Sequence, residues 1–143
     1  MCCSWRARHW ARVRSLLQHP VAADCRLLFL REGWVHIGVR DFEESGERRV
    51  LINVEGSVPL ALTTPQADEL HELVDCDFIR RSIGERQARG PIHLQETLAD
   101  DPLHPMRSHP RVRAARVSTD KPDVYPHCDA VGVAVFGVRA EPN

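Results

Sequence analysis

This 143-residue chain lacks long apolar stretches, cysteine pairs and an excess of either charge. Its longest apolar run, near residues 130–138, is far shorter than the roughly 20 residues that a membrane-spanning helix needs. The N-terminus has no uncharged apolar stretch like that of a secretory signal peptide. The five cysteines are odd in number and never spaced as CxxC, so a disulfide framework is not expected. We therefore expect a cytoplasmic protein without a membrane anchor.

Lysine is also nearly absent. Lys121 is the single lysine among 19 basic residues, and the others are all arginines. We attribute this excess of arginine to GC-rich codons, which favours a bacterial or phage source. The formal net charge of −1 means that no overall field draws the chain to nucleic acid or to a membrane.

The familiar catalytic and cofactor motifs are missing as well. The sequence contains no GxSxG nucleophile elbow, no phosphate-binding GxxxxGK[ST] loop and no GxGxxG fingerprint. The glycines at 132 and 137 lie within a strand-like pattern and precede no helix. The absence of these patterns favours a protein without catalysis.

The clearest pattern that is present is period-2 alternation. A short apolar run covers residues 25–31. Alternating runs cover residues 33–42, 48–54 and 58–62, and polar, glycine-containing turns separate them. Such runs are typical of an antiparallel meander with one buried face. Pro59 cannot donate to a ladder, so its strand is expected at an edge or a bulge.

Two helices are predicted around this meander. Residues 4–19 have apolar side chains at helical spacing beside a basic face, and Pro20 ends the segment. Residues 63–82 begin with capping-box and Thr–Pro signals and carry an apolar stripe that would cover the sheet. The predicted fold class is α+β: an antiparallel meander sheet of about four to six strands, an N-terminal helix and one capping helix at about 63–82.

We expect a single domain over residues 1–143 with four parts. They are a basic N-terminal helix (1–20) that can lie at the periphery, the meander with its helix (21–87), a proline-rich irregular crossing (88–129) and a central strand (130–139). The crossing is predicted to be irregular because each proline fixes φ and removes a backbone donor. The last segment is apolar on both faces, which is typical of a strand covered on both sides.

The proline-rich crossing holds the candidate metal ligands His104, His109, His127 and Cys128. Zinc prefers four nitrogen or sulfur donors in a tetrahedron, and these are suitable side chains. Their spacing matches no known zinc pattern, so the alternative is that they are ordinary loop residues. A hydrolytic version of such a site would use Asp129 or Glu96 as the base.

Arginines near both ends form a candidate nucleic-acid surface. Guanidinium groups can bind phosphates, and tryptophans interleaved with them can stack on bases. The proposed set is Arg6, Arg8, Arg12, Arg14, Arg107, Arg111, Arg113 and Arg116. The alternative is that these arginines lie on solvent-exposed faces and bind nothing. The net charge favours this alternative, because a nucleic-acid-binding domain usually has a basic net charge.

The sequence leaves three functional hypotheses. The first is a small, non-catalytic cytoplasmic module that acts through protein–protein contacts or self-association, without a cofactor. The second is nucleic-acid binding through the arginine-rich N-terminal helix and the 107–116 stripe. The third is a zinc site at the three histidines and Cys128.

Overall fold

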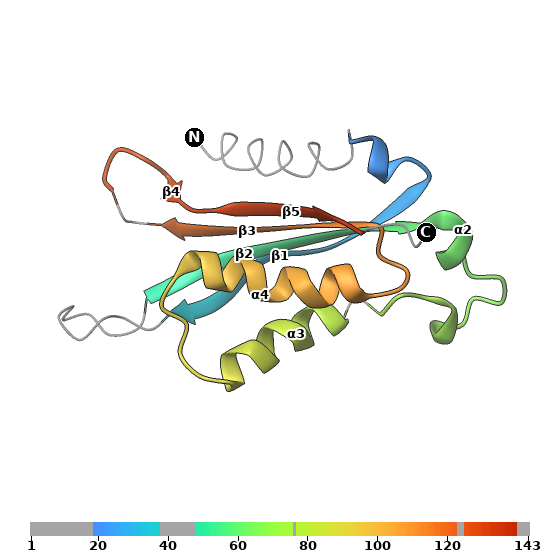
Figure 1. Ribbon diagram of the computed structural model, residues 1–143, viewed down its shortest axis with the longest axis horizontal. Coiled ribbons are helices and arrows are strands. Elements are labelled where there is room, and N and C mark those ends of the chain that lie inside the picture. The colour runs from blue at the N-terminus through green and yellow to red at the C-terminus, as the bar shows by residue number, and fades with distance from the viewer. Residues whose placement is uncertain (1–18, 38–47, 76, 123–124, 140–143) are drawn as a thin grey trace.

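The computed structural model describes residues 19–37, 48–75, 77–122 and 125–139. These residues form one antiparallel sheet with helices packed on one of its faces (Figure 1). The predicted α+β class with an antiparallel sheet is therefore confirmed. The helix expected over residues 4–19 lies almost wholly outside the described residues.

The sheet has five strands. They are β1 (Cys25–Ile37), β2 (Arg48–Pro59), β3 (Ala114–Pro122), β4 (Ala130–Val131) and β5 (Ala134–Val138). The order is β1-β2-β3-β4, and β5 also pairs with β3. Every pairing is antiparallel. β2 and β3 therefore form the centre of the sheet, and β1 lies at one edge.

The first two strands are longer than the alternation predicted. β2 continues through Glu55, Gly56 and Ser57, where a turn was expected. Gly56 does not form a turn. It allows Met106 to pack closely against β2, because a Cβ atom at position 56 would lie 2.7 Å from the Met106 methyl carbon. β1 also continues without a turn, and its register with β2 shifts between Leu30 and Gly33, as at a β-bulge.

The helices are α2 (Leu60–Thr63), α3 (Asp77–Ala88) and α4 (Gln95–Ser108), with 3-10 turns η1 (Pro20–Ala22) and η2 (Leu70–Glu72). The helix predicted over 63–82 thus begins later, at Asp77. The capping signals at Thr63–Gln66 were misleading, since residues 64–69 fold into a loop whose amides bind the Glu72 carboxylate.

The prediction of an irregular crossing over residues 88–129 was wrong. Most of this segment is helix α4 and strand β3. Pro102 and Pro105 lie inside α4, although an internal proline costs a helix a hydrogen bond. Packing outweighs that loss, because α4 presents a buried stripe to the sheet: Leu98, Ala99, Pro102 and Met106.

The prediction of a central strand over residues 130–139 was also wrong. The segment divides into β4 and β5, which pair only with β3 and lie at the edge of the sheet. Phe136 and Val138 are 43% and 42% exposed on the face away from the helices. The segment 130–139 therefore carries apolar residues on both faces although only one of its faces is covered by the helices.

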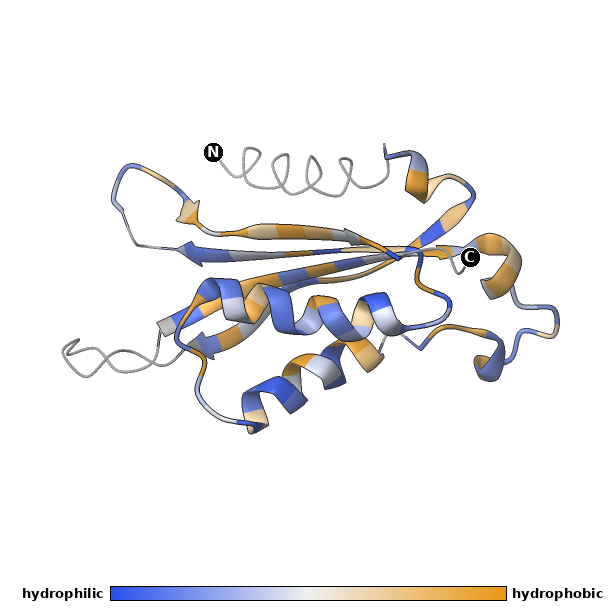
Figure 2. Cartoon of the chain, in the orientation of Figure 1, coloured by the Kyte–Doolittle hydropathy of each residue, from blue (hydrophilic) through white to orange (hydrophobic). Residues whose placement is uncertain are grey.

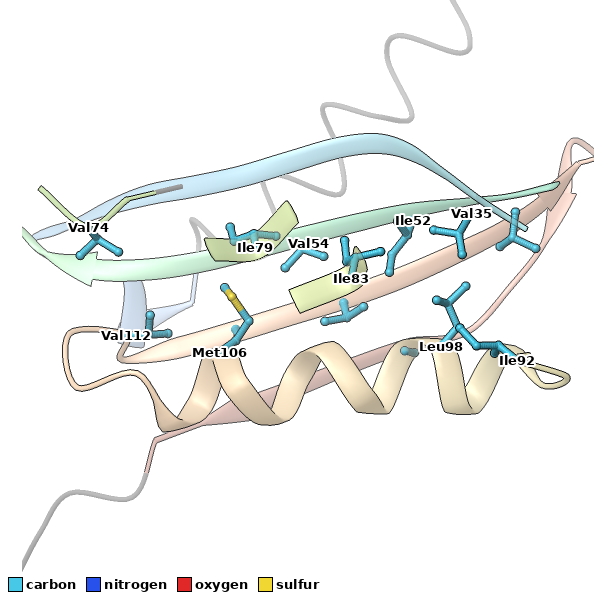
Figure 3. Packing of buried hydrophobic residues seen from close by; sticks show 14 of the residues in the cluster. Val35, Ile52, Val54, Val74, Ile79, Ile83, Ile92, Leu98, Met106 and Val112 are labelled. Atoms are coloured by element: carbon cyan, nitrogen blue, oxygen red, sulfur yellow. The ribbon is translucent and has the colours of Figure 1, made fainter. Parts of the chain in front are cut away.

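The core lies between the sheet and helices α3 and α4 (Figure 3). Both helices alternate hydrophilic and hydrophobic residues along their length, as an amphipathic covering layer does (Figure 2). Ile79 and Ile83 from α3 and Leu98 and Met106 from α4 are almost completely buried. The facing strand residues are Val35, Val50, Ile52, Val54, Val58, Ala115 and Val117. None of the described helices is long and apolar enough to cross a bilayer.

Candidate active site

The end of β3 and the beginning of α4 meet at one end of the sheet (Figure 1). Thr119, which is 1% exposed, donates its hydroxyl proton to Gln95 Oε1 over 2.7 Å. Its backbone N–H donates to the carbonyl oxygen of Val133 at 2.8 Å. The Val133 N–H in turn lies 3.4 Å from the Thr119 hydroxyl oxygen. One buried threonine of β3 therefore joins this strand to the start of α4 and to the connection between β4 and β5.

Two chemically active side chains flank this junction. Lys121 follows Thr119 by two residues, so strand alternation places both on the helix-covered face. Glu96 follows Gln95 in the first turn of α4. Lys121 is half-buried and Glu96 is exposed, and within the described part of the chain neither forms an ion pair. A half-buried amine and a carboxylate at one junction can transfer protons and bind a polar ring.

The four candidate metal ligands are not brought together. His104 lies on α4, and His109 follows that helix at the opposite end from the Thr119 junction. The His109 ring packs on Phe78 with centroids 5.0 Å apart. His127 and Cys128 are exposed in the connection between β3 and β4. Among the described residues, no group of three or more His, Cys, Asp or Glu side chains is arranged to hold a metal ion.

His109 has an unusual environment for a histidine. Burial, together with the nearby charges of Arg111 and Arg139, lowers the pKa of its imidazole below the ordinary value. Its Nδ1 atom accepts a hydrogen bond from the Arg111 N–H at 3.1 Å, and its carbonyl accepts one from Arg139. The ring thus serves the packing of the α4 end, since it stacks on Phe78 and fixes the following turn.

The candidate nucleic-acid arginines do not form one stripe where they are described. Arg107 donates to the Val138 carbonyl oxygen, and Arg113 donates to that of Ala23. Arg116 pairs with the buried Glu55 carboxylate, 3.4 Å away. Arg6, Arg8, Arg12 and Arg14 lie outside the described residues. Nucleic-acid binding stays a prediction.

Sequence reasoning missed the grouping of Lys121, Thr119 and Gln95, and considered Glu96 only as the base of a metal site. The available signal was compositional: one lysine in a chain whose other basic residues are all arginine. Because we attributed that bias to codon usage, the exception at Lys121 was not interpreted.

Comparisons with known proteins address the function. A protein-family model described as FolB, dihydroneopterin aldolase, matches residues 32–136. A comparison with curated proteins gives no match. The crystal structure of a dihydroneopterin aldolase from Burkholderia thailandensis bound to guanine is 52% identical, with a TM-score of 0.77. That match covers 87% of this chain and 99% of the Burkholderia chain.

Two more distant structures share the fold. A putative dihydroneopterin aldolase (FolB) from Vibrio cholerae is 21% identical, with a TM-score of 0.67 over 80% of this chain and 98% of its own. The Escherichia coli dihydroneopterin aldolase in complex with neopterin is 18% identical, with a TM-score of 0.66 over 78% and 98%.

These findings correct the functional prediction. A non-catalytic module that acts only through protein contacts was expected, because no familiar catalytic motif is present. That expectation was wrong, since the matched family consists of enzymes, and this family needs no added cofactor. The chain belongs to the dihydroneopterin aldolase (FolB) family.

Proposed function

We propose that this protein is a dihydroneopterin aldolase that cleaves a carbon–carbon bond in the side chain of a dihydropterin. The proposal is supported chiefly by the 52% identity to the Burkholderia aldolase over 99% of that chain. The Thr119 junction is the proposed site, because it brings a lysine and a carboxylate, neither of them ion-paired among the described residues, to the same end of the sheet.

The ligand class follows from the two liganded relatives. One binds guanine and the other binds neopterin. These molecules share a six-membered ring with an amino group beside a ring N–H and a carbonyl. A carboxylate can accept two parallel N–H bonds from such an edge, as it does from a guanidinium. Glu96 is the proposed acceptor for that edge, since no described cation competes for it.

The reaction is a retro-aldol cleavage. A proton leaves the side-chain hydroxyl, the adjacent carbon–carbon bond breaks, and the hydroxyl carbon departs as an aldehyde. The electron pair moves into the C=N bond of the dihydropterin ring, and a proton then returns to the remaining carbon. No net proton is consumed, so the site needs a group that holds and returns one. Lys121 is the proposed group.

The test uses purified protein and dihydroneopterin, with the aldehyde and pterin products separated and quantified. Lys121→Met keeps the length of the side chain and removes its charge. We expect kcat to fall by about 10²-fold or more, because a general acid–base group contributes 10²–10⁴-fold. Arg26→Met is the matched control, since it removes an exposed cation at the opposite end of the sheet from Lys121 and should leave kcat unchanged.

Two outcomes would contradict the proposal. Wild-type protein that binds guanine but releases no aldehyde would exclude the activity. A fully active Lys121→Met variant would exclude the assigned residue and leave the activity intact.

Self-association and a cytoplasmic location complete the proposal. The long edge strand β1 and the edge formed by β4 and β5 leave backbone groups that another copy could pair. Cys25 and Cys128 are free thiols, as expected in a reducing compartment. Light scattering at increasing protein concentration tests the association, and a constant monomer mass would contradict it.

A further inference from the structure

We propose that Thr119 is a positioning residue for this site: through Gln95 it fixes the Lys121 end of β3 against the first turn of α4. The inference rests on the proposed function, because it assigns Lys121 and Glu96 to the same reaction. Thr119 itself is 1% exposed and is not expected to touch the substrate.

The hydrogen-bonding pattern determines the direction of each bond. The Thr119 hydroxyl has one proton and two lone pairs. The Val133 N–H approaches the hydroxyl oxygen at 3.4 Å and uses a lone pair. The proton is therefore free to point at Gln95 Oε1, 2.7 Å away, so the amide orientation of Gln95 is fixed.

The backbone around Thr119 is held as firmly as its side chain. A Cβ atom on Gly132 would lie 1.6 Å from the Thr119 carbonyl oxygen, so the β4–β5 connection passes directly against this peptide. The Thr119 N–H is bonded to the Val133 carbonyl. The end of β3 is thus held by α4 on one side and by the β4–β5 connection on the other.

The consequence concerns the relative placement of Lys121 and Glu96. Lys121 lies two residues beyond Thr119 on β3, and Glu96 lies one residue beyond Gln95 on α4. The Thr119–Gln95 bond therefore links the two elements directly beside the groups that they carry. A small shift between the elements would misplace the proton-holding amine relative to a ring bound by Glu96.

The experiment compares Thr119→Val with Thr119→Ser. Valine keeps the shape and loses the hydroxyl, whereas serine keeps the hydroxyl. We expect kcat to fall about tenfold or more in Thr119→Val, since a misplacement of about 1 Å can cost 10²-fold. Thr119→Ser should recover kcat to within about threefold, and guanine affinity should change little in either variant.

Thr63→Val is the matched control. Thr63 is 2% exposed, and its hydroxyl donates to the Pro59 carbonyl oxygen at 2.7 Å. It lies after β2, at the opposite end of the sheet from Lys121. The substitution removes a hydroxyl of similar burial and bond length, so it should lower stability by a similar amount and leave kcat unchanged.

Gln95→Leu provides an independent route, because Gln95 is only half-buried and its loss should not prevent folding. We expect a similar fall in kcat, and no more than about a twofold further fall in the Thr119→Val/Gln95→Leu double variant. Additive losses, failure of serine to rescue, or an equal loss in Thr63→Val would overturn the inference. Wild-type protein without aldolase activity would instead overturn the proposed function.

Discussion

At the scale of single residues, position 132 requires glycine because the backbone of Thr119 leaves no room for a side chain. A methyl group at this position would overlap the Thr119 carbonyl oxygen, which cannot move without disturbing β3. We predict that Gly132→Ala lowers the free energy of unfolding by about 1–3 kcal/mol. Urea titration measures the change. Gly84→Ala, within α3 and with nothing within 4 Å, should instead be neutral or stabilising by about 0.5–1 kcal/mol.

His109 gives the protein a specific acid sensitivity. Burial and the charges of Arg111 and Arg139 lower its pKa in the folded state. As the pH falls through the ordinary histidine range, the unfolded chain takes up the proton first, so stability present above that range is lost below it. We predict that His109→Asn reduces the loss of melting temperature between pH 7 and pH 5. An unchanged pH dependence in the variant would contradict this assignment.

At the scale of elements, the loop between α2 and η2 is organised by one carboxylate. Glu72 accepts hydrogen bonds from the backbone N–H groups of Glu69, Gln66 and Ala67, and these bonds lower its pKa. Asp68, between them, has a positive φ of 57°. The carboxylate thus stabilises a turn that the backbone alone would disfavour.

We predict that Glu72→Gln weakens this loop without unfolding the sheet. Hydrogen exchange at the amides of Gln66, Ala67 and Glu69 should become faster, while exchange in β2 stays unchanged. In the wild type, the same protection should be lost as the pH falls through the lowered pKa of Glu72, because protonation removes the charge that these bonds stabilise. Equal exchange rates in the two proteins would show that the carboxylate is dispensable.

Local sequence patterns predicted the elements unevenly. Alternation located β1 and β2 because their core-facing residues repeat every second position, as with Val50, Ile52 and Val54. The helical segments were predicted less well. Thr63–Gln66 matches a capping box although no helix begins there, and Pro102 and Pro105 are typical of a helix break although they lie inside α4. In both places tertiary contacts outweighed a local preference that was read correctly.

At the scale of the whole molecule, the hydrophobic core lies on the face of the sheet that α3 and α4 cover. Leu98 is fully buried between α4 and the sheet (Figure 3). We predict that Leu98→Ala lowers the free energy of unfolding by about 2–5 kcal/mol, as cavity-forming substitutions do. Leu94→Ala is the control, since Leu94 is 50% exposed just before α4 and should cost far less. Comparable urea midpoints for the two variants would contradict this description of the core.

The active site was not predictable from local pattern, and the reason is topological. Gln95 and Thr119 are 24 residues apart, and their contact depends on α4 folding back along β3. No sequence motif reports that arrangement. The solitary lysine was visible, but its meaning required both the family comparison and the position of β3 beside α4.

The solitary lysine has a practical consequence for studying the protein. An amine-reactive reagent has only one side-chain amine to modify within these 143 residues, and that amine lies at the proposed site. Mass spectrometry can therefore follow the occupancy of the site through a single modified peptide. Protection of that peptide by guanine would map ligand binding directly, without a substitution and without an activity assay.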